Sequence, residues 1–170
     1  ILHLAPTTST TAQIAMGDAL AVSLMQQRGF TSVDFARLHP GGSLGRRLLM
    51  TVGNVMRDHD LPVVSPDCSV VEMIHTISKG GLGLIVVCEG DRIEGIVTDG
   101  DVRRAMERLK ADFFNIRARD IATPHPKTIG AGEKLIEAER VMTRNKITSL
   151  LVTGDDGRLT GVIQIYDIKL

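Results

Sequence analysis

From residue 51 onward, short apolar runs alternate with segments in which apolar residues recur at helical spacing. Near-continuous apolar runs are typical of buried strands, and recurrence three and four positions apart is typical of amphipathic helices. Tight polar turns at 90–91 and 155–157 join adjacent strands, which predicts two hairpins. The predicted strands are 63–64, 84–87 and 93–97, then 128–129, 150–152 and 159–163, with helices beginning near Ser69 and Glu133 and after Asp101 and Asp167.

These elements form two copies of one unit. The segment 95–102 (GIVTDGDV) is matched 66 residues later by 161–168 (GVIQIYDI). The same offset aligns 84–87 with 150–153 and 54–56 with 120–122, while 69–73 aligns with 134–138 after one residue is removed. A strand–helix–strand–strand–helix unit cannot cover both faces of its own sheet. The sequence therefore predicts an α/β (α+β) fold in which two copies pack together about a pseudo-twofold axis.

The first fifty residues show a different pattern, with helical segments around a Gly-rich stretch instead of alternating strands and helices. Ser9, Thr10 and Thr11 precede a pattern that predicts a helix over 12–28, and Gly29 stands where a left-handed cap is needed. The hydroxyl cluster at 7–11 either caps a helix or contacts a sugar phosphate, because helix N-termini attract anions, and capping is the interpretation we prefer. Residues 39–45 (HPGGSLG) are too rich in Gly and Pro for regular structure, and a short helix is predicted over 46–50.

Composition narrows the class of protein. The 170 residues carry 20 basic and 20 acidic side chains and five aromatic rings, which argues against a basic nucleic-acid binder or a membrane-surface protein. No apolar run approaches the roughly 18 residues of a membrane span. Cys68 and Cys88 lack metal-ligand spacing, so we expect reduced buried thiols, no metal site and a cytoplasmic location. Because the chain begins with Ile1 rather than Met, we expect it to be part of a longer protein.

The repeated segment carries the candidate chemistry. Gly95-x-x-Thr98-x-x-Asp101 lies where a buried strand ends and a helix begins. A hydroxyl and free amides at a helix N-terminus suit a phosphate, and a carboxylate suits the vicinal hydroxyls of a ribose. The other interpretation is that Thr98 and Asp101 only cap the helix. Arg104 is placed to reach a second phosphate or a sugar-acid carboxylate, although a solvated helix charge is the simpler interpretation. His125 lies between Pro124 and Pro126 in the linker between the copies and is placed to line a cleft, although a plain loop residue is the interpretation we prefer.

With this duplicated segment, residues 51–170 resemble a tandem pair of cystathionine-β-synthase-type (CBS) domains, a regulatory module that binds nucleotides in clefts between its copies. The resemblance implies domains at 51–115 and 116–170, a phosphate contact from Thr98 and a ribose contact from Asp101. In the second copy Gln164 replaces the Thr, so we expect one competent site or two unequal ones. The other expected nucleotide-binding residues are Val64, Asp99, Arg104 and Asp167.

Residues 1–50 resemble the carboxyl-terminal end of a sugar-isomerase (SIS) domain, through LAPTTSTT at 4–11, MGDALA at 16–21 and HPGGSLGRR at 39–47. An SIS end followed by a CBS-type pair is similar to the bacterial D-arabinose-5-phosphate isomerases. Those enzymes interconvert D-ribulose 5-phosphate and D-arabinose 5-phosphate and feed synthesis of the sugar acid Kdo of lipopolysaccharide and some capsules. The resemblance implies that His39 is catalytic, a role suited to a side chain that moves protons near neutral pH. The family's other catalytic groups belong upstream of Ile1, so we expect this chain alone to be inactive.

The same resemblance implies partners. A sugar phosphate is the substrate of the longer protein, no cofactor is required, and the regulatory effector is a nucleotide, either cytidine-5′-monophosphate-Kdo (CMP-Kdo) or AMP or ATP. Homotetramers through the catalytic domain and dimers of CBS-type pairs are implied, with no nucleic-acid or membrane partner. The alternative is a stand-alone adenine-nucleotide-sensing or oligomerisation module with no enzymatic role. It predicts that no isomerase sequence precedes this chain.

Overall fold

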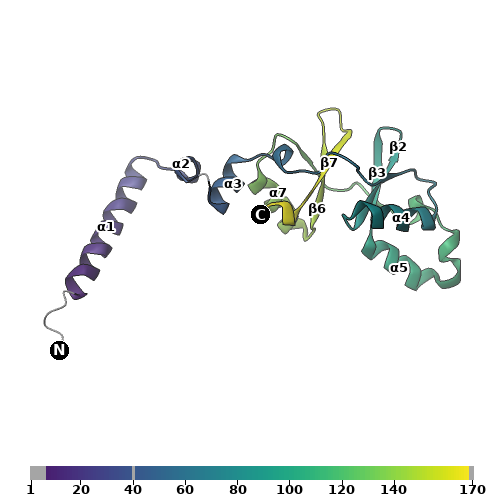
Figure 1. Cartoon of the computed structure of the whole chain (residues 1–170), viewed down its shortest axis with the longest axis horizontal. Helices are drawn as coiled ribbons and strands as arrows, with labels where there is room; N and C mark the ends of the chain where they lie inside the picture. The colour runs from purple at the N-terminus through teal and green to yellow at the C-terminus, as the bar shows by residue number, and fades with distance from the viewer. Residues whose placement is uncertain (1–6, 40, 169–170) are drawn as a thin grey trace. The chain divides into compact units, whose positions relative to one another are not determined.

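The chain forms two compact units that divide between Leu49 and Met50. The computed structural model describes residues 7–39 and 41–168 (Figure 1), so positions 4–6 and 40 of the sugar-isomerase-like motifs lie outside the described residues. Every described element of the smaller unit is a helix, and the larger unit contains both repeats.

Helix α1 (Thr7–Gln27) begins five residues before the predicted start. Thr10 and Thr11 therefore lie inside the helix, where their hydroxyls donate to the Thr7 carbonyl at 3.0 and 2.9 Å, so the predicted capping role for Ser9, Thr10 and Thr11 is wrong. No residue of α1 is buried. Its largely exposed apolar side chains are Ile14, Met16, Leu20, Val22, Leu24 and Met25.

Two short helices follow α1. Gly29 adopts φ +59°, which confirms the predicted left-handed cap. Helix α2 (Ser32–Leu38) begins with a capping box between Thr31 and Asp34. Helix α3 (Ser43–Leu49) includes residues 43–45, so the prediction of irregular structure is wrong for that part of the Gly-rich stretch.

The larger unit contains the predicted strand–helix–strand–strand–helix order twice, which confirms the α/β prediction. Its first sheet has the order β1-β2-β3-β4 and its second the order β5-β6-β7. The first set comprises β1 (Val63–Val64), α4 (Val70–Gly80), β2 (Leu84–Glu89), β3 (Arg92–Thr98) and α5 (Asp99–Leu109). The connection contains the 3-10 helix η2 (Lys110–Asn115), α6 (Ala118–Ile121) and β4 (Thr123–Pro124). The second set comprises β5 (Thr128–Gly130), α7 (Leu135–Asn145), β6 (Ser149–Thr153), β7 (Leu159–Gln164) and α8 (Ile165–Ile168), and the 3-10 helix η1 (Val52–Asn54) precedes the first set.

Strand pairing corrects one part of the predicted alignment between the copies. Leu84 lies opposite Thr98 in the first hairpin, whereas Ser149 lies opposite Gln164 in the second. Leu84 is therefore equivalent to Ser149, and the predicted match of 84–87 with 150–153 is wrong by one residue. The extra residue of the second copy lies in its turn, because Cys88 pairs with Ile93 but Thr153 pairs with Leu159.

Each sheet is extended by a segment that precedes the other copy. β4, which lies before β5 of the second copy, pairs with β3 and places Thr123 opposite Ile96. Arg57, which lies before β1 of the first copy, exchanges two backbone hydrogen bonds of 2.9 Å with Val162 in β7. The motif glycine makes this approach possible, because a Cβ on Gly95 would lie 2.7 Å from the Thr123 carbonyl oxygen. A Cβ on Gly161 would likewise lie 2.9 Å from the Arg57 carbonyl oxygen.

The interior divides into three apolar clusters. The first lies between the first sheet and its helices, where α4 and α5 are seen beside β2 and β3 in Figure 1. The second belongs to the second sheet but also contains Val52, which precedes the first copy. The third contains residues from both sheets, including the equivalent positions Val86 and Leu151. Equivalent residues meeting in one cluster are what a pseudo-twofold axis between the copies produces.

Candidate functional site

A cleft of about 420 Å³ lies between the two repeats. The first repeat contributes the start of β2 and the end of β3, and the second contributes the residues before β5 and after α7. The described residues that line the cleft include four hydroxyls and two lysines but no carboxylate. They are Leu82, Gly83, Leu84, Ile96, Thr98, Thr123, His125, Pro126, Lys127, Lys146, Ile147, Thr148, Ser149 and Leu151.

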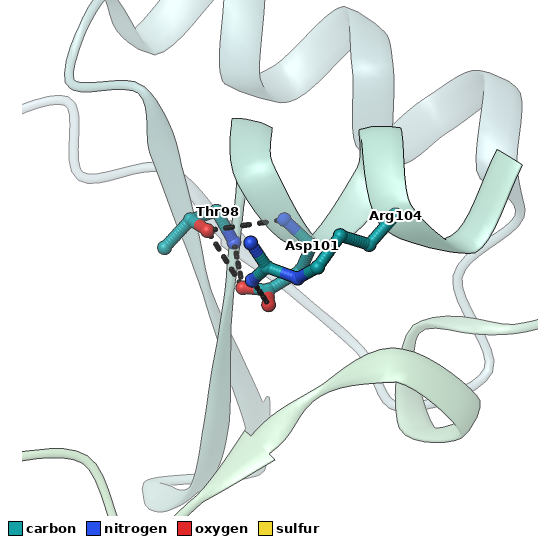
Figure 2. Close-up of polar contacts among 3 residues, drawn as sticks. All are labelled: Thr98, Asp101 and Arg104. Atoms are coloured by element: carbon teal, nitrogen blue, oxygen red, sulfur yellow. Dashed lines mark hydrogen bonds and ion pairs between the residues drawn. The ribbon is translucent and has the colours of Figure 1, made fainter. Parts of the chain in front are cut away.

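Thr98 reaches this cleft from the N-cap position of α5, where it is hydrogen-bonded to Asp101 (Figure 2). The Thr98 hydroxyl donates to Asp101 Oδ2 at 2.7 Å and accepts the Asp101 N–H at 3.2 Å. Asp101 Oδ2 also accepts the Thr98 N–H at 2.9 Å. Thr31 and Asp34 make the same three contacts at 2.7, 3.2 and 2.9 Å in the other unit. The capping geometry by itself is therefore no sign of a ligand.

Asp101 is partly buried and pairs with Arg104 at 2.5 Å between Oδ1 and Nη2. Burial raises the pKa of Asp101, but the hydrogen bonds from Thr98 and the interaction with Arg104 outweigh it and lower the pKa below its usual value. The carboxylate is therefore ionised at neutral pH and able to accept hydrogen bonds from hydroxyl groups.

The expected first-site residues do not all face one hollow. Thr98 lines the cleft, whereas Asp101 and Arg104 line a separate hollow of about 360 Å³ beside α5. Asp99 begins α5, and its N–H donates to the Gly83 carbonyl at 3.0 Å. Val64 is 7% exposed and packs in the first apolar cluster, so its side chain contributes to the core and not to the wall of the cleft.

The position equivalent to Thr98 in the second repeat makes different contacts. The Gln164 amide donates to the Leu82 carbonyl and to the Ser149 hydroxyl, both at 3.0 Å, and so links the two repeats. Asp167 keeps part of the capping arrangement by accepting the Gln164 N–H at 2.7 Å.

Arg57 stands at the position equivalent to Thr123. Its guanidinium donates to three backbone carbonyls, those of Gly80 at 2.5 Å, Asp60 at 3.1 Å and His59 at 3.1 Å. Two long, hydrogen-bonded side chains, Gln164 and Arg57, thus stand at the second cleft where the first cleft has the shorter Thr98 and Thr123. The clefts are unequal.

Several residues of the cleft wall had no signal in the sequence. Thr123, Lys127 and Lys146 stand outside the repeated motif, and His125, expected to be a plain loop residue, also lines the cleft. The positive charges of the two lysines follow from no periodicity. Comparison of the two copies shows only that the lysines are not repeated, because the equivalent positions are Pro62 and Gly81.

His39 lies in the smaller unit, after α2. Its Nδ1 lies 3.3 Å from the Phe35 carbonyl oxygen, and its ring stacks on the Phe35 ring at 4.5 Å between centroids. The side chain is exposed. Its contacts here are those of a helix C-cap residue.

The thiols lie outside the cleft wall. Cys68 and Cys88 are buried and free, as expected. Burial raises the pKa of Cys68 to about 11 and also raises the pKa of Cys88. Both thiols are therefore protonated and unreactive at neutral pH.

The family model for the CBS domain matches residues 52–108 and 118–169. The chain belongs to the CBS domain family. A solved CBS domain protein with the same fold is PAE2072 from Pyrobaculum aerophilum, complexed with AMP. It is 23% identical, with a TM-score of 0.62, over 69% of this chain and 89% of that one.

Sequence similarity extends beyond the CBS pair. The chain is 44% identical over 166 residues to arabinose 5-phosphate isomerase KpsF of Escherichia coli O6:H1, covering 97% of this chain and 50% of that protein. It is 43% identical over 169 residues to arabinose 5-phosphate isomerase KdsD of Yersinia pestis, covering 98% and 51%. The CBS chain thus spans about half the length of the curated relatives it matches. Among its described residues, no helix has the length and apolarity needed to cross a membrane.

Proposed function

We propose that this chain is the regulatory half of a bacterial arabinose-5-phosphate isomerase: a nucleotide-binding CBS pair preceded by the last part of the sugar-isomerase domain, at residues 1–50. The observation that carries the proposal is identity of 43–44% along almost the whole chain to enzymes of that name. The exposed apolar residues of α1 support it, because a helix with no buried residue needs a packing partner.

The proposed reaction of the longer protein is interconversion of D-ribulose 5-phosphate and D-arabinose 5-phosphate in the cytoplasm, on the route to Kdo. Aldose–ketose isomerisation moves a proton between C1 and C2, and His39 is the proposed contributor from this chain. Without the other catalytic groups, the 170 residues alone are inactive. The coding sequence before Ile1 tests this proposal. It is expected to encode a phosphate-binding loop and the missing acid–base groups, and an unrelated upstream sequence would contradict it.

The proposed effector site is the cleft that contains Thr98. Its apolar walls suit a nucleobase, and its hydroxyls and lysines suit a ribose phosphate. Asp101 lines the separate hollow beside α5 but is hydrogen-bonded to Thr98 of the cleft, and it is proposed to accept ribose hydroxyls once Arg104, which is 68% exposed, turns away. Asp99 begins α5 directly after Thr98. Binding of AMP by a CBS protein of the same fold supports this assignment.

The second cleft is proposed to be closed by Gln164 and Arg57. A ligand there would have to displace hydrogen bonds to four backbone carbonyls, those of Leu82, Gly80, Asp60 and His59. The bonds to Gly80 and Leu82 are partly buried, and each of these two carbonyls left without a donor costs about 1–3 kcal/mol. Asp167 alone therefore does not make a second site, and one nucleotide binds per chain.

Calorimetric titration tests the site and the base preference together. AMP, ATP, CMP and CMP-Kdo are compared on the full chain, and one of them is expected to bind with a stoichiometry near one. The variant Thr98→Ala/Asp101→Ala is expected to lose nucleotide-dependent thermal stabilisation. The matched control is Thr31→Ala/Asp34→Ala, which removes an identical capping box outside the cleft. Equal nucleotide stabilisation in both variants would show that Thr98 and Asp101 only cap α5 and do not bind the nucleotide.

The proposed assembly is a dimer of CBS pairs, within a tetramer of the longer enzyme. Helices α4 and α5 expose Val71, Ile74 and Met106 at 68%, 41% and 51%, an apolar surface suited to a second copy. Sedimentation of the chain is expected to report a dimer, and of a Val71→Lys/Ile74→Lys variant a monomer.

A further inference from the structure

The two motif side chains, Thr98 and Asp101, offer no free donor to the anionic part of the ligand. The Thr98 hydroxyl, which family resemblance assigns to phosphate, already donates its one proton to Asp101 Oδ2 at 2.7 Å. Asp101 itself is ionised and would repel a phosphate. A phosphate in the cleft must find its positive charge elsewhere.

Lys127 and Lys146 are the two lysines that line the cleft, and both come from the second repeat. Lys127 lies immediately before β5, and Lys146 follows the last residue of α7. Within the part of the chain that the structure describes, neither ammonium group has a carboxylate at ion-pair distance, and the cleft wall carries none. The nearest acid on the first-repeat side is Asp99, whose Oδ2 would lie 3.2 Å from a Cβ on Gly83. Unpaired cations on the opposite side of a cleft attract anions.

The internal repeat provides a control for this charge. The positions equivalent to Lys127 and Lys146 in the closed cleft are Pro62 and Gly81. Gly81 ends α4 at φ +67° without strain, whereas Lys146 ends α7 at φ +54°, a conformation that favours glycine. A lysine is therefore held in an unfavourable backbone conformation in the open cleft, where the closed cleft has the residue that the geometry prefers. Such strain is commonly associated with function.

The charge continues beyond the cleft. Lys127 also lines a hollow of about 310 Å³ along α7, together with Arg140 and Arg144. Arg140 is paired with Glu137 at 2.6 Å. No ion pair of Arg144 occurs among the described residues. The positive surface thus runs from the cleft onto α7.

We propose that Lys127 and Lys146 form a phosphate-binding subsite at the second-repeat side of the cleft, so that the cleft selects nucleotides over nucleosides. This inference rests on the proposed function, since the cleft must first accept a nucleoside. It assigns the phosphate to the lysines rather than to Thr98.

The test is calorimetric titration of the full chain with two matched pairs, adenosine against AMP and cytidine against CMP. In the pair whose base is accepted, the nucleotide is expected to bind roughly 10- to 100-fold more tightly than the nucleoside. Lys146→Gly and Lys127→Met are each expected to remove much of that preference while nucleoside binding is kept. Raised salt is expected to weaken nucleotide binding only.

Thermal unfolding separates lost binding from lost folding. Lys146→Gly relieves a left-handed backbone and is expected to raise Tm while it weakens the nucleotide. Lys110→Gly is the control, because Lys110 also has positive φ at a helix C-cap, +49°, although with ψ −114° instead of +43°, and does not line the cleft. It is expected to leave both affinities unchanged.

Three results are decisive. Loss of nucleotide preference in the lysine variants, with the Lys110→Gly variant unchanged, supports the subsite. Equal binding of nucleoside and nucleotide by the unmodified chain overturns the subsite and leaves the nucleoside cleft intact. Binding of neither member of either pair overturns the subsite, and if ATP and CMP-Kdo also fail to bind, the proposed effector site is overturned with it.

Discussion

Gln164 is the side chain whose loss should separate the two repeats most directly. Its amide makes two hydrogen bonds of 3.0 Å, one to the Leu82 carbonyl in the first repeat and one to the Ser149 hydroxyl in the second. Gln164→Ala removes both donors and leaves two partly buried acceptors unpaired. At about 0.5–1.5 kcal/mol for each bond, the expected loss is about 1–3 kcal/mol in the free energy of unfolding.

For a unit of this size, that loss corresponds to a fall in Tm of roughly 4–12 °C. The chain has no Trp, so differential scanning calorimetry of the larger unit is the direct measurement. Asn145→Ala is the matched control, because the Asn145 amide makes one exposed hydrogen bond of 2.8 Å to the Val141 carbonyl within α7. It is expected to cost less than about 0.5 kcal/mol. Equal, small shifts for both variants would refute the assignment of Gln164 as a link between the repeats.

Two further predictions concern the motif in the first repeat. Gly95→Ala places a Cβ 2.7 Å from the Thr123 carbonyl oxygen and is expected to lower the free energy of unfolding, measured in urea, by about 1–3 kcal/mol. The control Gly132→Ala has no atom within 4 Å of its Cβ and is expected to cost little. Similar losses in the two variants would contradict the inference that Gly95 is needed for the close approach of Thr123. The pKa of Asp101 is lower in the folded state than in the unfolded state, so the ionised carboxylate stabilises the fold. This stabilisation is fully present above the pKa of the unfolded state and is lost as the pH falls through the pKa of the folded state. Asp101→Asn is therefore expected to reduce stability near pH 7 and to match the unmodified chain near pH 2, and a pH-independent difference would contradict this.

The sequence predicted the order of elements but not the register of every strand. Strand β2 begins with Leu84, while the equivalent residue of β6 is Ser149, so matching by identity moved the alignment to the next leucine. Both strands are buried over nearly their whole length, and a near-continuous apolar run carries no alternation to fix a register. Only pairing across the hairpin, opposite Thr98 and Gln164, decides it.

The cleft wall was predicted least well, for a different physical reason. The motif residue Thr98 was found because it recurs with its neighbours, but Thr123 and Arg57 are brought to their clefts by pairing with the sheet of the other copy. No local pattern encodes that crossing. The motif glycines are an indirect sign of the crossing, because Gly95 and Gly161 have no side chain at the points where the Thr123 and Arg57 segments approach closely.

The crossing of edge segments also constrains how the chain is made. Arg57 leaves the ribosome early, but its partner Val162 is synthesised more than a hundred residues later. Val52 likewise becomes buried only after β6 and β7, which contribute to the same apolar cluster, have been synthesised. Pairing over such a separation is slow compared with local folding, and it leaves apolar surface exposed in the meantime. Neither repeat is therefore a self-sufficient module that can be excised by a single cut, and the segment around Arg57 is paired only when β7 has been made.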